Sequence, residues 1–209
     1  MEIQEISARL DTALQKAKGG LILDEYTKSL YLTKAQALFV EAMLARYEYG
    51  DALRHVLGNM LNSVTVNIFT YEGIDLYGLV PETDILSILY EELNAEKIAT
   101  IPLDYNDIHD ARVNPFRKPY KKLAYRITGN KKLTIFSTET VTQYFYDYCR
   151  EPLPIVLEAL PSPLNIQGAD TEVNSVLPYD SMLKVIDLAV QEIIKDISIL
   201  SPPKKEAQK

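Results

Sequence analysis

Hydrophobic positions recur with a helical period through the first sixty residues. Apolar side chains every three or four positions predict an amphipathic helix over residues 2–18, which Gly19 and Gly20 end. Asp24 occupies the N-cap position of a second, longer helix that runs to about residue 49. The expected buried stripe of this second helix is Tyr26, Leu30, Ala37, Val40 and Leu44. The chain therefore opens as a helical bundle with short connections.

A third helix completes this part of the chain in the prediction. Asp51 can cap it, and its apolar stripe runs from Leu53 to Leu61. From Val64 the period shortens to two, which is typical of strands, and the segments VTVNIFT, IDLYGLV, ILSILYEEL, KKLAYRI, KLTIFS and VTQYFYDYC are predicted strands. The proline-punctuated PLPIVLEALPSP is predicted as an edge strand and loop.

Gly129 and Asn130 predict a hairpin between two of these strands. A two-residue Gly-Asn loop would mix apolar and basic groups on both faces of the pair. A three-residue loop ending at Lys131 instead pairs Ile127 with Leu133. This register collects the apolar side chains on one face, namely Leu123, Tyr125, Ile127, Leu133 and Ile135.

The C-terminal part returns to a helical period. Residues 104–111 predict one short helix, and Tyr179 to about Leu200 predict a long one with a broad apolar face that packs centrally on the N-terminal bundle. The expected face is Met182, Ile186, Ala189, Ile193 and Ile197. The fold class is therefore α+β: a helical bundle from 1–62 and 177–200, a β-rich insertion at 63–176, and a disordered tail at 201–209.

Composition removes several functional classes. The 209 residues are 47% hydrophobic with a net charge of −7, and no apolar run approaches the length of a membrane span. One cysteine and two histidines cannot form an internal disulfide or a zinc site rich in Cys and His. Neither GxxxxGK[ST], GxGxxG nor GxSxG occurs. We expect no enzyme, no cofactor and no membrane partner.

The remaining candidates for chemistry have simpler structural explanations. The run DYNDIHD could hold a hard cation through Asp104, Asp107 and Asp110, but helix capping and the helix dipole also account for it, and we favour these. His55 lies near the apolar stripe of the third helix and is interpreted as a packed or boundary residue, and Cys149 as a small buried hydrophobic residue. The 14 tyrosines suit either strands or an interface.

Charge is divided unevenly along the chain. Residues 111–138 contain eight basic residues and no Asp or Glu. Subtracting these eight charges from the net charge of −7 leaves −15 for the rest. A basic two-stranded ribbon that includes Lys121, Lys122 and Arg126 could bind DNA, dock on an acidic face of a neighbouring subunit, or simply protect a sheet edge. We favour docking because the chain supplies its own acidic complement.

The order of several segments resembles a group of virion proteins from crAss-like tailed phages. These segments are YTKSLYLTKAQALFVEAML, NPFRKPYKKLAYRI, TQYFYDYCREPLPIVL and IQGADTEVNSVLPYDSMLKVIDLAVQEIIKDI. Together they span most of the chain, and they are structural rather than catalytic.

The resemblance implies a ring-forming protein of the portal-tail connector, similar in role to the adaptor or gatekeeper proteins of short-tailed phages. Such rings are usually twelvefold, with the portal and other ring or tail proteins as partners and with DNA only passing through the channel. The segment most typical of the group supplies the expected contact residues, Asn114, Pro115, Phe116, Arg117, Lys118 and Pro119.

Overall fold

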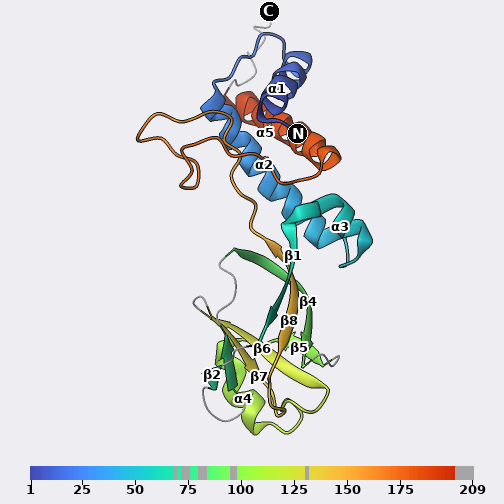
Figure 1. The fold of residues 1–209 in the computed structure, drawn as a ribbon. Helices are drawn as coiled ribbons and strands as arrows, with labels where there is room; N and C mark the ends of the chain where they lie inside the picture. Colours follow the sequence, from blue (N-terminus) through green and yellow to red (C-terminus); the bar gives the residue numbers. More distant parts are fainter. Residues whose placement is uncertain (68–69, 72–75, 80–83, 95–97, 130–131, 201–209) are drawn as a thin grey trace, which may run out of the picture. The chain divides into compact units, whose positions relative to one another are not determined.

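The structure is a computed structural model that describes residues 1–67, 70–71, 76–79, 84–94, 98–129 and 132–200. The chain divides into two compact units (Figure 1). The helical unit contains Met1–Met60 and the chain from Pro152 onward, and the sheet unit contains Leu61–Glu151. The predicted α+β class is confirmed. Within the described part of the chain, no helix has the length and hydropathy to cross a membrane.

Three N-terminal helices begin the helical unit. They are α1 (Ile3–Ala17), α2 (Glu25–Arg46) and α3 (Asp51–Leu57). Asp24 caps α2 as predicted, because its carboxylate accepts a hydrogen bond of 2.8 Å from the backbone N–H of Thr27. These hydrogen bonds from Thr27 also hold the pKa of Asp24 below its ordinary value.

The third helix is shorter than predicted. Gly50, not Asp51, is its N-cap, and the helix ends at Leu57 before the 3-10 turn η1 (Gly58–Met60). Gly58 has φ +52°, and a Cβ there would lie 2.9 Å from Pro178. Gly58, with its positive φ, ends the helix. Leu61 therefore begins a strand and does not continue the apolar stripe predicted for the third helix.

The long helix α5 (Tyr179–Leu200) packs between α1 and α2, as predicted (Figure 1). Most of the expected apolar face is buried, including Met182, Ile186, Ala189 and Ile193. The broad apolar stripe of α5 therefore provides the centre of the helical unit.

The predicted stripe of α2 is wrong in most positions. Of the five expected residues only Val40 is buried, and Leu30 is 41% exposed. The buried face instead includes the polar residues Ser29, Thr33 and Gln36. These three positions repeat with helical spacing and cover an extended segment of the same unit.

That segment, Pro152–Leu157, binds α2 through its backbone. The side chain of Gln36 donates to the Leu153 carbonyl (2.7 Å), the Ile155 N–H donates to Thr33 Oγ1 (3.0 Å), and the Leu157 N–H donates to Ser29 Oγ (3.0 Å). Every second residue of the segment is thus hydrogen-bonded to a side chain of α2. In a sheet, the backbone of a neighbouring strand would satisfy these groups.

This arrangement accounts for two differences from the prediction. The segment PLPIVL is not an edge strand, and only Val156 forms an isolated bridge, with Val173. The sheet unit ends at Glu151, whereas the sequence suggested an insertion to residue 176. The predicted tail, 201–209, lies outside the described residues.

The sheet unit contains two sheets. The first has the order β1-β8-β4, all antiparallel, from β1 (Leu61–Val66), β4 (Ile85–Leu93) and β8 (Tyr144–Arg150). The second has the order β2-β3-β7-β6-β5. Its strands are β2 (Thr70–Tyr71), β3 (Leu76–Leu79), β5 (Ala99–Pro102), β6 (Leu123–Gly129) and β7 (Lys132–Phe136), and only β5 and β6 pair in parallel.

The register predicted for the β6–β7 hairpin is wrong by one residue. Ile127 pairs with Thr134, and Tyr125 pairs with Phe136. The loop residues 130 and 131, on which the prediction rested, lie outside the described residues. A one-residue shift moves alternate side chains to the other face, so the expected single apolar face does not form.

Instead, both faces of the second sheet are buried. On one face, Ala124, Leu133 and Ile135 share a core with Tyr144 and Tyr146 of the first sheet. On the other face, the apolar side chains pack against the short helix α4 (Ile108–Val113), which follows the 3-10 turn η2 (Tyr105–Asp107). The apolar residues of β6 and β7 therefore serve two cores.

Candidate assembly interface

The connection from η2 through α4 to β6 presents a surface that combines exposed apolar and basic side chains. Phe116 is 96% exposed, Tyr105 73%, Val113 64% and Tyr120 60%. We call this the α4–β6 surface, formed by the exposed side chains of Tyr105, Arg112, Val113, Phe116, Arg117, Lys118, Tyr120, Lys121 and Lys122. Large apolar groups left in water are typical of contact surfaces.

A tight turn projects Phe116 from this surface. The side-chain oxygen of Asn114 accepts a hydrogen bond of 3.0 Å from the Phe116 N–H. The carbonyl of Asn114 accepts hydrogen bonds of 3.0 Å from the N–H groups of both Arg117 and Lys118. Pro119 is buried below the turn. Of the six contact residues that the resemblance implied, Asn114 holds the turn, Pro119 is buried and the others are exposed.

Most of the cations on this surface have no carboxylate partner in the part of the chain that the structure describes. Arg117 forms a 2.6 Å ion pair with Asp110, and both side chains are about half exposed. Arg112 lies over the ring of Phe136, 5.8 Å from its centroid. Among the described residues no ion pair involves Arg112, Lys118, Lys121 or Lys122. Their charges remain available to a partner.

Arg126 occupies a different environment from the other predicted contact residues. Its guanidinium lies 2.8 Å from Glu91 Oε1, and both side chains are nearly buried, at 12% and 10% exposure. The hydroxyl of Tyr144 donates to the other carboxylate oxygen of Glu91 (2.9 Å). Burial raises the pKa of Glu91 and outweighs the opposing effects of Arg126 and Tyr144. Arg126 is thus a core residue of the sheet unit.

The basic hairpin is not a free two-stranded ribbon. Strands β6 and β7 are interior strands of the five-stranded sheet, flanked by β5 and β3. The exposed lysines Lys118, Lys121 and Lys122 lie before β6, in the connection from α4. The exposed charges of the basic segment are therefore divided among elements, with Arg112 in α4, the three lysines in the connection and Lys132 in β7.

A hollow of about 530 Å³ opens beside α4. Apolar side chains of Leu76, Ile108 and Ile127 line it together with Tyr105, His109 and Arg112. The hollow therefore adds a cavity of mixed lining beside the α4–β6 surface, with Tyr105 and Arg112 common to both.

The other candidate residues are placed as structural groups. Asp104 is the N-cap of η2 without a side-chain hydrogen bond, and Asp110 pairs with Arg117. In the described ranges, no three His, Cys, Asp or Glu side chains are grouped so that they could hold a metal ion. Cys149 is buried, and burial raises the pKa of its thiol to about 11. His55 lies in the last turn of α3 and is exposed, so the interpretation of this residue as packed is wrong.

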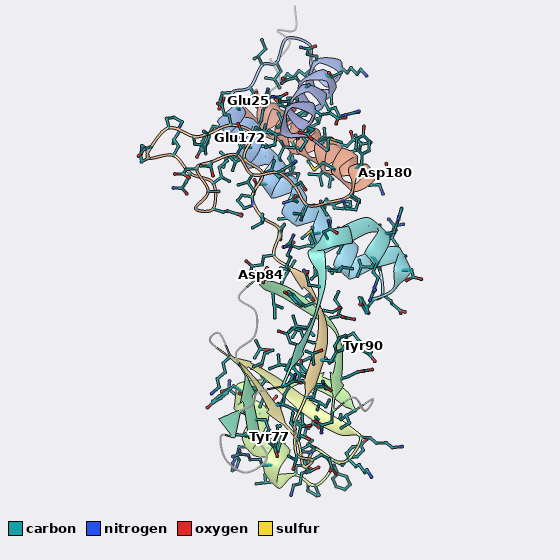
Figure 2. The ribbon with its side chains drawn as sticks, viewed as in Figure 1. Glu25, Tyr77, Asp84, Tyr90, Glu172 and Asp180 are labelled. Atoms are coloured by element: carbon teal, nitrogen blue, oxygen red, sulfur yellow. The ribbon has the colours of Figure 1, made fainter. Side chains whose placement is uncertain are left out.

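Sequence reasoning missed an acidic counterpart in the helical unit. From Glu151 to Leu183 the chain contains five acidic residues and no Lys, Arg or His. Figure 1 shows the segment before α5 as loops that extend beyond α2. We call residues 156–173 the acidic arm, and its exposed carboxylates are Glu158, Asp170 and Glu172 (Glu172 is labelled in Figure 2). The run without basic residues was a signal that the sequence already contained.

Comparison with known proteins finds similarity over most of the chain. The family model described as phage tail ring protein 3/4 matches residues 1–201. Ring protein 3 of Bacteroides phage crAss001 is 27% identical over 198 residues, which cover 81% of this chain and 86% of that protein. Ring protein 4/5 of the same phage is 26% identical over 221 residues, covering 90% of this chain and 92% of that protein.

Proposed function

The chain belongs to the phage tail ring protein 3/4 family, and from this membership we propose that its copies form a twelvefold ring in the portal-tail connector of the virion. As a crAss-like phage tail ring protein it is a structural component of a phage tail. In the proposed position, the ring joins the capsid portal to the tail and surrounds a channel through which DNA passes.

The observation that carries this proposal is the extent of the family match. It covers residues 1–201 and so includes both the helical and the sheet unit. Both crAss001 relatives also align over more than four-fifths of this chain. A role of the whole chain in a ring is therefore better supported than a role of either unit alone.

The charge distribution is consistent with a ring that conducts DNA. A net charge of −7 gives little general attraction for a polyanion. Carboxylates facing a channel would repel phosphates, so DNA could slide through the channel without being retained. Assembly would take place in the host cytoplasm before the ring joins the portal and the other ring and tail proteins.

Electron microscopy and native mass spectrometry test the proposal. We expect the purified full chain, alone or mixed with the portal protein of the same phage, to form closed rings whose mass corresponds to twelve copies. Monomers only, under both conditions, would contradict a ring role. Rings of another copy number would overturn the twelvefold assignment and leave the ring role intact.

The alternative function, a DNA-binding module that uses residues 112–132, has weaker support. Arg126 is paired inside the sheet unit, and β6 is an interior strand. If the alternative were correct, Lys121→Ala with Lys122→Ala would lower duplex DNA affinity and flatten its dependence on salt concentration. We expect no duplex binding by the unmodified protein at low salt, measured by fluorescence anisotropy.

A further inference from the structure

We propose that the acidic arm of one copy docks on the α4–β6 surface of the next copy in the ring. This inference rests on the proposed ring and adds to it the two surfaces that meet. The partner is a second copy of this chain, and the contact joins the helical unit of one copy to the sheet unit of another.

The acidic arm is a built structure with its own small core. Val156, Leu160 and Ile166 are buried together against Tyr26 of α2. The backbone pairs Val156 with Val173 by two hydrogen bonds of 3.0 Å, and the Leu160 N–H donates to the Asp170 carbonyl (2.7 Å). An arm that is already ordered loses little conformational entropy when it docks.

The acidic arm carries three exposed carboxylates. Glu158, Asp170 and Glu172 are exposed, and among the described residues none of them forms an ion pair. The arm also exposes an apolar side chain, Leu164, at 39%. An arm with exposed carboxylates and an exposed apolar side chain is the chemical complement of a surface with exposed cations and aromatic rings.

The α4–β6 surface has that composition. Lys118, Lys121 and Lys122 follow the exposed Phe116 and flank the exposed Tyr120 in sequence, and no carboxylate among the described residues pairs with these lysines. The hollow beside α4 could receive an apolar side chain such as Leu164 of the arm. Exposed aromatic rings are frequent anchors of protein contacts.

The location of the two surfaces favours a ring over a closed dimer. The acidic arm belongs to the helical unit, and the α4–β6 surface belongs to the sheet unit. Contacts between two different patches are heterologous, so each copy keeps one free patch for the following copy until the ring closes. A protein copy is also a better occupant than DNA, because this surface exposes the apolar side chains of Val113 and Phe116, which a phosphate backbone would leave in water.

Charge reversal tests the proposal in the full-length protein. We make Lys118→Glu, Lys121→Glu and Lys122→Glu in one variant, and Glu158→Lys, Asp170→Lys and Glu172→Lys in another. Each triple change should lower the ring fraction seen by native mass spectrometry by about tenfold or more, since ten-fold corresponds to only about 1.4 kcal/mol. Circular dichroism establishes that each variant is folded.

Matched controls separate local contact from net charge. Lys16→Glu, Lys18→Glu and Lys184→Glu change the charge by the same amount as the first variant, and Glu41→Lys, Glu48→Lys and Asp187→Lys match the second. All six positions are exposed in the helical unit and lie outside the acidic arm. We expect both controls to form rings as the unmodified protein does.

Recombining the reversals gives the most specific readout. Mixing the two reversed variants should restore rings in which they alternate, because each contact again joins opposite charges. A single chain that carries all six reversals should also form rings. Loss of assembly through misfolding would not be repaired by either combination.

Cross-linking provides a second measurement on a protein with its charges intact. A chain with Phe116→Cys and Leu164→Cys should form intermolecular disulfides that link copies into a ladder of oligomers. The native Cys149 is buried and gives little background. Each single cysteine variant should give no more than dimers.

The outcomes distinguish this inference from the proposed function. Rings that persist in both reversed variants, together with no cross-linked ladder, would overturn the docking of the arm and leave the ring role standing. Binding of duplex DNA that the lysine reversals remove, with rings unchanged, would overturn it in favour of a nucleic-acid surface. If the unmodified protein forms no ring with or without its portal, the proposed function itself fails.

Discussion

The two units bury polar groups by different means. In the helical unit, the neutral side chains of Ser29, Thr33 and Gln36 hydrogen-bond the backbone of an extended segment. In the sheet unit, the charged side chains of Glu91 and Arg126 pair inside the fold. Backbone groups can satisfy neutral polar side chains, whereas a buried charge needs one specific partner. The loss of stability on removing a single side chain should therefore differ between the two units.

Lys28 shows that burial of a charge also depends on its partners. Its side chain is 4% exposed, and its ammonium lies 2.7 Å from both Asp11 and Glu25. Burial lowers the pKa of Lys28, but the hydrogen bonds to the two carboxylates raise it more, and the pKa lies above its ordinary value. Because both carboxylates are partly exposed, water can stabilise them without Lys28. Glu91 lacks this access.

The largest effect should come from Arg126→Ala. Removing the guanidinium leaves the Glu91 carboxylate buried beside Tyr144, and we expect the free energy of unfolding to fall by about 3–5 kcal/mol. Urea denaturation measures the loss, and hydrogen exchange should locate it in β6 and β8. Arg117→Ala is the matched control, because its ion pair is half exposed and its loss should cost less than about 1 kcal/mol. Equal losses would show that the Arg126 pair is not effectively buried.

A smaller effect is expected in the helical unit from Thr33→Val. The substitution keeps the shape of the side chain but leaves the Ile155 N–H without its acceptor, at a cost of about 1–3 kcal/mol. Thr12→Val on the exposed face of α1 is the control and should change stability by no more than about 0.5 kcal/mol. Faster hydrogen exchange of the Ile155 amide in Thr33→Val but not in Thr12→Val would show that the loss of stability lies in the segment Pro152–Leu157.

The smallest effect is a change in pH dependence. Because burial raises the pKa of Glu91 above its ordinary 4.5, the folded sheet unit binds this proton more tightly than the unfolded chain does. The Glu91 contribution to stability therefore increases as pH falls from 7 through its folded pKa toward 4.5. Glu91→Gln removes it, so the stability of the unmodified protein minus that of the variant should grow as pH falls, measured by urea denaturation. A difference that is independent of pH would contradict the raised pKa.

The same contrast explains which parts of the fold could be predicted. The face of α5 was predictable because nearly all its buried residues are apolar and repeat with helical spacing. The face of α2 was not, because what it buries is decided by a backbone segment more than a hundred positions later in the chain. Hydrophobicity alone contains no record of Thr33 binding Ile155.

The hairpin register failed for a related reason. The prediction assumed that one face of β6 and β7 would be buried and the other exposed, as in a sheet with one solvated face. Helix α4 covers one face and the first sheet covers the other, so apolar residues were needed on both. The strand pair therefore carries one apolar set on each face. Ile127 and Phe136 lie on the face toward α4, and Leu133 and Ile135 lie on the face toward the first sheet.

At the candidate interface, the sequence was informative about charge and less so about exposure. The basic segment and the absence of acids within it were evident from composition. Arg126 is nearly buried while Lys121 and Lys122 are exposed, although the sequence placed all three together on a basic ribbon. The acidic arm was overlooked because its carboxylates are spread among prolines and apolar residues and not gathered in a run.

The pairing of β1 with β8 has a consequence for how such a protein can evolve. Leu61, the first residue of the sheet unit, lies opposite Cys149, two residues before its last. The helical unit therefore receives the 91 residues of the sheet unit as a loop with adjacent ends, and closing such a loop costs nearly the same whatever its length. An insertion joined in this way can be enlarged or trimmed at little cost to the folding of the unit that carries it.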